Sequence, residues 1–333
     1  MSSNGKSGST IKKIVKPIAD IVATPVTYVA ASLFKKMREN NFRDFPRNKK
    51  LLFKKGVFPI LDHYYEPMFN PRHLQYSLRE DRRLNAVDMN VNGQIGLLAK
   101  FRYNEELLSI PMENTGKIEY YYNNGSFLSG DSEHLYNMIR HLKPKNIIEI
   151  GSGLSTLMAL KAIEKNRSED ASCNCKMMCV EPYEMDWLEK TEAVIIRKRV
   201  EDLEMSFFET LGENDILFID SSHIIRPQGD VLFIYLQILP AIGQGVHIHI
   251  HDIFTPKDYL DEWIFKNIRL WNEQYLVEAF LSYNQHFKIT AALNYLRHNH
   301  FNEFSAKCPV LKKHIESGTE REPGSLWLVK TKM

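Results

Sequence analysis

The sequence predicts an α/β fold with a parallel sheet covered by helices on both faces, and two observations lead to this prediction. From Lys145 onward, short apolar segments alternate with segments whose apolar residues recur at helical spacing. The first of these apolar segments runs directly into a glycine turn and then into a helical stretch. Strands that alternate with helices are typical of parallel sheets, whose strands are buried on both faces.

Each element of this α/β region can be placed on the chain. A helix is expected from Asp131, which can cap its N-terminus, to Leu142, because apolar residues recur between them every three or four positions. A second helix follows the glycine turn, and a third covers residues 231–239. The expected strands are residues 146–150, 176–181, 193–200, 215–220 and 245–252, and two further strand-like segments are residues 287–291 and 325–329.

The sequence divides the chain into three parts: residues 1–40, an α-rich N-terminal extension over residues 41–125, and the α/β domain over residues 126–333. The Gly- and Ser-rich residues 1–10 are expected to be disordered. An apolar run of fourteen residues from Ile21 to Phe34 follows, interrupted by Pro25 and flanked by lysines. This run is shorter than the roughly 20 residues that span a bilayer as a helix. We expect residues 11–38 either to lie in a membrane interface or to pack on the protein's own body.

Composition limits the classes of partner. The 333 residues are 44% hydrophobic and 25% charged, as in ordinary soluble globular proteins. The formal net charge of +2 argues against nucleic acid as a partner, because proteins that bind nucleic acid usually carry a concentrated basic face. The start of the chain does not have the pattern of a secretory signal. We expect a cytoplasmic protein, peripheral at the inner face of the cell membrane if residues 11–38 contact lipid.

The glycine turn carries the strongest chemical signal. Gly151-Ser152-Gly153 separates the first strand from the following helix, at the sheet edge where open α/β sheets bind ligands. Glycines there let the backbone approach a ligand closely. Thr156 stands where a dinucleotide fingerprint has its third glycine, which argues against a nicotinamide cofactor. Glu181 ends the next strand, where a carboxylate can accept both hydroxyls of a ribose.

Three segments together resemble the class I S-adenosylmethionine-dependent methyltransferases. They are Ile-Ile-Glu-Ile-Gly-Ser-Gly at 147–153, Phe-Ile-Asp-Ser-Ser-His at 218–223 and Val-His-Ile-His-Ile-His-Asp-Ile-Phe at 246–254. The last two look like segments of bacterial methyltransferases from surface-polysaccharide and other glycan pathways. The resemblance implies a Rossmann-like sheet of seven strands whose last strand is antiparallel. Residues 287–291 and 325–329 would then form the final hairpin.

The resemblance also implies S-adenosyl-L-methionine as the cofactor. The residues that would hold its methionine end are Glu149, Gly151, Ser152 and Gly153. Glu181 would bind the ribose. Either Glu201 or Asp202, which come just after the third strand, would meet the adenine, and the choice between them stays open.

Four polar residues follow the fourth and fifth strands: Asp220, His223, His251 and Asp252. These strands are neighbours in the implied fold, so the four residues should meet at one edge of the sheet. Asp220 and Asp252 would suit a divalent cation such as Mg²⁺, although His251 stands where related metal-dependent enzymes have an acid. Alternatively, His223 or His251 acts directly as the base on an acceptor hydroxyl, with Asp220 beside it.

These observations predict methyl transfer from S-adenosylmethionine, with a hydroxyl oxygen of a glycan or glycosylated small molecule as the acceptor. Arg226 and the run from Trp271 to Tyr275 are expected near the same face, where they could recognise a polar acceptor. Two other interpretations stay open. One is a different enzyme on a Rossmann-like fold, such as a hydroxylase or a nucleotide-dependent enzyme. The other is a non-catalytic cofactor-binding scaffold at the membrane.

Overall fold

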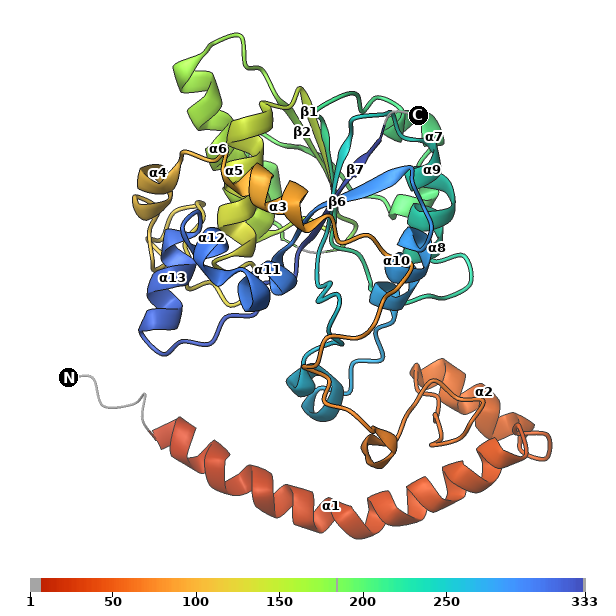
Figure 1. The fold of residues 1–333 in the computed structure, drawn as a ribbon. Helices are drawn as coiled ribbons and strands as arrows, with labels where there is room; N and C mark the ends of the chain where they lie inside the picture. Colours follow the sequence, from red (N-terminus) through yellow and green to blue (C-terminus); the bar gives the residue numbers. More distant parts are fainter. Residues whose placement is uncertain (1–6, 184, 332–333) are drawn as a thin grey trace. The chain divides into compact units, whose positions relative to one another are not determined.

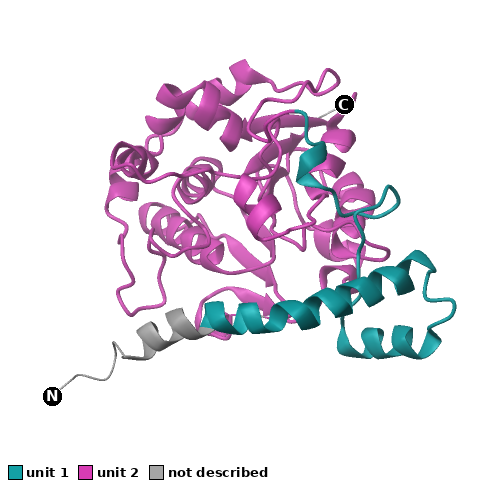
Figure 2. Cartoon of the chain, turned by 90° about the horizontal axis from the view of Figure 1, so that it is seen from below, with its two compact units in different colours: residues 1–75 teal, residues 76–333 magenta. Residues whose placement is uncertain are grey.

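The computed structural model describes residues 7–183 and 185–331, and for residues 7–15 it describes the backbone only. The chain forms two compact units, residues 1–75 and residues 76–333, which Figure 2 colours separately. The boundary differs from those predicted at residues 40 and 125. The reason is that residues 76–125 supply buried side chains, among them Phe101, Tyr120 and Tyr122, to the same hydrophobic core as the α/β domain.

The first unit consists mainly of one long helix. α1 runs over Ser7–Glu39 and continues through Pro17 and Pro25, so Pro25 does not end it; Figure 1 shows it as a curved ribbon. Residues 7–10, expected to be disordered, belong to its first turns, whereas the disorder expected for residues 1–6 lies outside the described residues. Two short helices follow, α2 (Pro46–Lys55) and η1 (Pro71–His73). A small core of Met37, Phe42 and Leu52 joins the end of α1 to α2.

The length of α1 corrects one argument made from the sequence. The apolar run from Ile21 to Phe34 is too short to cross a bilayer, but the helix extends it in both directions. Its segment Lys16–Glu39, 24 residues with a mean hydropathy of 1.4 over its most apolar window, is long and apolar enough to cross a membrane by length and composition. Large apolar side chains such as Ile21, Val22 and Val26 are exposed along it.

The second unit is built on a seven-stranded sheet with the strand order β3-β2-β1-β4-β5-β7-β6. Strands β1 to β5 are parallel, and β7 runs antiparallel to both of its neighbours, β5 and β6. The predicted Rossmann-like sheet with an antiparallel last strand is therefore confirmed. The strands are β1 (Asn146–Ile150), β2 (Lys176–Val180), β3 (Val194–Ile196), β4 (Ile216–Ile219), β5 (His247–Ile250), β6 (Phe287–Ala292) and β7 (Leu326–Lys330).

Helices cover both faces of this sheet, as its apolar strands require. Alternate residues of a strand enter different cores: Ile147 and Phe218 face one, and Ile148 and Leu217 face the other. The helices packed on the first face are α3 (Val91–Leu98), α4 (Asn104–Leu108), α5 (Asp131–Leu142), α6 (Leu154–Glu169), α11 (Leu293–Asn299), α12 (Phe301–Ser305) and α13 (Pro309–Glu316). Those on the second face are α7 (Met205–Phe208), α8 (Asp230–Phe233), η4 (Ile234–Ile238), α9 (Leu239–Ala241) and α10 (Glu273–Leu281). Three short helical segments lie in loops: η2 (Leu188–Lys190), η3 (Val200–Asp202) and η5 (Glu262–Lys266).

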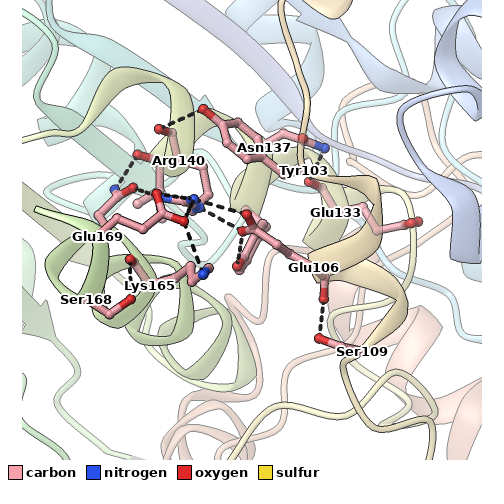
Figure 3. A network of polar contacts seen from close by, with 12 residues as sticks. Tyr103, Glu106, Ser109, Glu133, Asn137, Arg140, Lys165, Ser168 and Glu169 are labelled. Atoms are coloured by element: carbon pink, nitrogen blue, oxygen red, sulfur yellow. Dashed lines mark hydrogen bonds and ion pairs between the residues drawn. The ribbon is translucent and has the colours of Figure 1, made fainter.

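A buried ion-pair network ties the segment before the sheet to the helices of the first face (Figure 3). The guanidinium of Arg140 in α5 pairs with Glu106 of α4 and with Glu169 of α6, each at 2.8 Å. Glu106 also accepts a hydrogen bond from Tyr136, and Lys165 pairs with Glu169 at 3.1 Å. Because the guanidinium of Arg140 is almost fully buried, loss of Glu106 would leave it with the exposed Glu169 as its remaining ion-pair partner among the described residues. The network therefore holds α4 as part of the second unit.

Candidate functional site

A cavity of about 1070 Å³ opens where the parallel strands β1, β2, β4 and β5 end. Its wall contains residues from the loops that follow each of these strands, and from the loops before α10 and β7. This is the edge at which open α/β sheets bind ligands. The predicted site residues that line it are Gly151, Ser152, Gly153, Glu181, Glu201, Asp220, His223, His251 and Asp252.

Gly151 brings the glycine turn against the end of β4. Its φ of +77° is a left-handed conformation, and an added Cβ would lie 1.8 Å from the carbonyl oxygen of Asp220. The peptide of Gly151 is held from the other side by a hydrogen bond to the carbonyl oxygen of Val180 at 3.0 Å. Glycine is required at this position, because both the backbone conformation and the space exclude a side chain.

Glu149 does not line the cavity, in contrast to the expectation that it holds the methionine end of the cofactor. Its carboxylate is buried and accepts hydrogen bonds from the hydroxyls of Ser155 and Thr156 in the first turn of α6. Burial raises the pKa of Glu149 to about 7. Glu149 precedes the cavity-lining Ile150 in β1, so its side chain points to the other face of the sheet. Its hydrogen bonds there anchor the first turn of α6, which follows the glycine turn.

Glu181 lies beside the glycine turn at the end of β2. One carboxylate oxygen accepts the backbone N–H of Ser152 at 3.2 Å, and the other accepts the N–H of Tyr183 at 2.9 Å. These hydrogen bonds hold the carboxylate at the cavity wall. The position agrees with the predicted role of Glu181 as an acceptor for hydroxyl groups.

The structure separates the two candidates for the adenine contact. Glu201 lines the cavity, and its side chain is largely shielded from solvent. Asp202 does not line the cavity; its exposed side chain pairs with Arg199 at 2.7 Å, and hydrogen bonds from Arg199 lower the pKa of Asp202. The geometry therefore favours Glu201.

The four polar residues predicted after β4 and β5 lie together. The Nε2 atom of His223 is 3.2 Å from a carboxylate oxygen of Asp220 and 3.6 Å from one of Asp252. His251 approaches the other oxygen of Asp252 at 3.6 Å. One ligand atom each from Asp220, His223 and Asp252 fall within 4.8 Å of one another, as the ligands of a divalent cation would.

Glu273, at the start of α10, holds His223 in place. One carboxylate oxygen forms a hydrogen bond with the Nδ1 atom of His223 at 2.8 Å, and the other accepts one from the hydroxyl of Tyr235 at 3.1 Å. All three side chains are buried. The carbonyl oxygen of His223 accepts the backbone N–H groups of Asn272 and Glu273. The left-handed backbone of His223, with φ of +59°, is thus fixed by the N-terminus of α10. With Nδ1 hydrogen-bonded to Glu273, the Nε2 atom is the one directed at Asp220 and Asp252.

The sequence did not predict this role of Glu273. The run from Trp271 to Tyr275 was singled out for acceptor recognition, but nothing in it indicates a partner 50 positions earlier in the chain. A buried Glu at the N-terminus of a helix is the only local signal, and it fits a structural role equally well.

The charges in this cluster favour a bound proton or cation. Burial opposes a charged His223, but its hydrogen bonds to Asp220 and Glu273 outweigh burial and raise the pKa of His223 well above its usual range. Burial would raise the pKa of Asp220, yet the charges of His251 and His223 lower it. Burial raises the pKa of Asp252. The cluster can therefore hold a proton between a carboxylate and an imidazole.

His247 and His249, to which we assigned no role, lie on β5 away from the cavity wall. His249 is fully buried and stacks on Phe218 with ring centroids 3.9 Å apart. Burial lowers the pKa of both imidazoles, so they stay neutral and serve packing.

Aromatic and basic side chains form the wall opposite the glycine turn. Trp271 lies against the ring of His223, with centroids 4.3 Å apart, and Arg226 also reaches the cavity, as expected from the sequence. Trp263, Arg269 and Arg321 belong to the same wall and were not predicted. They come from an irregular segment around η5 and from the loop before β7, where no periodic pattern exists to place them.

Comparison with known proteins identifies relatives of this chain. The model of a methyltransferase domain family matches residues 148–253. An uncharacterized protein from Archaeoglobus fulgidus is 31% identical over 173 residues, which are 48% of this chain and 76% of that protein. The plantazolicin methyltransferase BpumL in complex with SAH has a TM-score of 0.35 at 13% identity, covering 60% of this chain and 83% of that one. The O-methyltransferase TomG from Streptomyces achromogenes in complex with SAM has a TM-score of 0.36 at 11% identity, covering 71% and 90%.

Proposed function

We propose that this chain, which belongs to a methyltransferase family, transfers the methyl group of S-adenosylmethionine to a hydroxyl oxygen of a glycan or glycosylated small molecule. One observation carries the proposal: a single cavity contains both the glycine turn after β1 and the cluster of acids and histidines after β4 and β5. The first suits a nucleoside-containing cofactor, and the second suits proton transfer from an acceptor.

The residues at one end of the cavity fit the cofactor. The volume of about 1070 Å³ is sufficient for a ligand of this size together with an acceptor group. Gly151 leaves the backbone bare where a Cβ would fill the turn, Glu181 would place a carboxylate beside the ribose hydroxyls, and Glu201 would face the adenine. S-adenosylmethionine, when bound, supplies an activated methyl group on its sulfonium.

The residues at the other end would handle the acceptor proton. In a direct displacement the acceptor oxygen forms a bond to the methyl carbon as the carbon–sulfur bond breaks, and the hydroxyl proton must leave. The carboxylate of Asp220, which lies at the cavity beside the Nε2 atom of His223, can receive it. Glu273 keeps Nε2 in this orientation from the opposite side of the ring. The contribution of the protein is mainly positioning and proton acceptance.

A metal-assisted variant has its own support. Asp220, Asp252 and His223 would hold a divalent cation, and Glu273 would orient the imidazole as carboxylates commonly do for metal-bound histidines. Carboxylate oxygens favour Mg²⁺, while the imidazole favours a transition metal. Dialysis against a chelator distinguishes the routes. Loss of transfer that added Mg²⁺ or Mn²⁺ restores supports the metal, and unchanged transfer supports proton acceptance by the side chains alone.

The test of the proposed function uses the full chain. Purified protein is incubated with methyl-labelled cofactor and a cell-envelope extract, and the labelled product is identified. We expect Asp220→Asn to lower labelling far more than it lowers the affinity for S-adenosylhomocysteine measured by calorimetry. If wild-type protein binds NAD tightly and S-adenosylhomocysteine not at all, the proposal is wrong. Label on a nitrogen or on protein would overturn the proposed acceptor class while leaving methyl transfer in place.

We also propose that residues 11–38 contact a membrane, with the protein at the cytoplasmic face. The exposed apolar side chains of α1 support this proposal, as do the exposed basic residues Lys35 and Lys36 near its C-terminal end. A membrane would place the catalytic unit near lipid-linked or envelope glycans.

A further inference from the structure

We propose that the acceptor is anionic and that Arg269 binds its carboxylate or phosphate group, with Arg321 as a second contact. The inference rests on the proposed function, because it assigns a substrate class to the same cavity. It is supported by the environment of the arginine side chains that line the cavity.

Arg269 lies in the corner formed by two indole rings beside the catalytic cluster; the ring centroids are 5.1 Å apart and the ring planes are inclined at 75°. Its guanidinium carbon lies 4.4 Å from the ring centroid of Trp263 and 4.3 Å from that of Trp271. Trp271 in turn contacts the ring of His223 at 4.3 Å. The indoles fix the plane of the guanidinium and leave its N–H edge available for hydrogen bonds. An anionic group bound to Arg269 would lie near His223, because the ring of Trp271 contacts both side chains.

The arginines of the cavity wall fall into two kinds. Arg199 and Arg226 are exposed, and each has a carboxylate partner, Asp202 at 2.7 Å and Asp230 at 3.7 Å. Arg269 and Arg321 are half-buried, and within the described residues neither forms an ion pair. Two positive charges of the cavity wall therefore have no ion-pair partner within the described residues, and the nearby acid on which the charge of Arg269 acts is Asp252 of the cluster itself. The arginines nearer the solvent are neutralised by their own carboxylates.

Arg321 shows the cost of this arrangement. Its Nε–H group is buried and donates to no partner among the described residues, and burial lowers the pKa of Arg321. Taking a charged group out of water without a partner is unfavourable. A carboxylate or phosphate restores the lost interactions with short, charge-assisted hydrogen bonds, and its two oxygens match the fork of a guanidinium. A neutral hydroxyl group would offset much less of this cost.

Small probes test the inference without knowledge of the natural acceptor. The full chain is saturated with S-adenosylhomocysteine and titrated with glucuronate, glucose 1-phosphate and glucose, and tryptophan emission is followed. We expect at least one anionic probe to change the emission saturably, whereas glucose does not. The tighter of the two anionic probes shows whether the acceptor group is a carboxylate or a phosphate.

The matched variants are Arg269→Met, Arg269→Lys and Arg167→Met. Loss of a charged hydrogen-bonded contact should weaken binding of the anionic probe by about tenfold or more in Arg269→Met. Arg269→Lys, which keeps the charge without the fork, should weaken it less. Arg167→Met, which alters an exposed ion pair with Glu192 outside the cavity, should change it by less than about threefold. Calorimetry with S-adenosylhomocysteine verifies that each variant is folded.

The outcomes separate this inference from the proposed function. Equal binding of glucose and the anionic probes, absence of binding by both anions, or retained anion binding in Arg269→Met would overturn the inference even if S-adenosylhomocysteine binds. Anion binding that depends on Arg269 in a protein that does not bind S-adenosylhomocysteine would instead overturn the proposed function and leave the anion site standing.

Discussion

The two ends of the cavity are built in different ways. The end around the glycine turn is made largely from backbone groups, and its parts come from two consecutive strands and the loops after them. The other part begins beside the glycine turn at Asp220 and is made from side chains of five separate segments, those around Asp220, Asp252, Trp263, Trp271 and Arg321. A site made from backbone groups depends on the backbone conformation and on the space around it. A site assembled from side chains of several segments depends on how those side chains are oriented. The same kind of substitution should therefore damage stability at one end and turnover at the other.

The largest expected effect concerns the backbone of the glycine turn. Gly151→Ala adds a Cβ that meets the carbonyl oxygen of Asp220 at 1.8 Å, and it does so at a φ of +77°. We expect the free energy of unfolding to fall by roughly 3 kcal/mol or more, measured by denaturant titration. Gly125→Ala is the control, because Gly125 has a φ of +81° but no atom within 4 Å of an added Cβ. It should lose only about 1–2 kcal/mol from the backbone conformation. Equal losses would show that contact with β4 is unimportant.

At the assembled end, Glu273→Gln should act on turnover. The amide cannot hold a charged imidazole as a carboxylate does, so His223 loses its orientation and part of its charge stabilisation. We expect methyl transfer to the extract acceptor to fall by about 100-fold, with S-adenosylhomocysteine affinity unchanged within about twofold. Tyr235→Phe removes only the outer hydrogen bond and should cost about tenfold or less. A parallel loss of cofactor affinity in Glu273→Gln would mean that the residue merely supports the fold.

A third variant tests the cofactor end through affinity. Glu181→Ala removes the carboxylate proposed to accept the ribose hydroxyls and should weaken S-adenosylhomocysteine binding about tenfold or more, since hydrogen bonds to charged groups are worth about 1.5–3 kcal/mol. Calorimetry provides the measurement. Asp202→Ala, which alters an exposed ion pair outside the cavity, should leave the affinity unchanged. The assignment of the ribose to Glu181 fails if the two variants bind alike.

The smallest effect on the cavity is expected from the first unit. Removing residues 1–40 should leave S-adenosylhomocysteine affinity unchanged, because the residues that line the cavity all belong to residues 125–324. The same deletion should abolish sedimentation with anionic liposomes, and salt should weaken sedimentation of the full chain by screening its lysines. A full chain that stays in the supernatant would show that α1 does not bind lipid. Recovery of the full chain only with detergent would indicate that α1 crosses the bilayer.

The sequence was informative wherever local pattern decides structure. The helix predicted from Asp131 to Leu142 has those bounds in the structure, and the strand at residues 146–150 does as well. Strands of a parallel sheet are buried on both faces, so they are apolar whichever helices pack on them, and the sequence alone is enough to locate them. The left-handed turn at Gly151 is equally local, because only glycine tolerates it at little cost. The prediction that Asp220 and Asp252 lie close together followed from the expected strand order alone.

Tertiary structure decided what local pattern leaves open. Glu149 and Glu181 both lie near strand ends, yet only Glu181 lines the cavity. Glu149 lies within β1 and its carboxylate is buried, whereas Glu181 follows the last residue of β2, at the edge where the cavity opens. The pairing of His223 with Glu273 joins residues 50 positions apart and leaves no periodic trace in the sequence. The same holds for the contacts of Arg269 with the rings of Trp263 and Trp271. The sequence by itself determined the sheet, the glycine turn and the edge at which ligands bind, because these follow from backbone conformation and apolar periodicity. Only the folded chain decided which charges are paired and which face the cavity, because that depends on side chains meeting across loops of no regular structure.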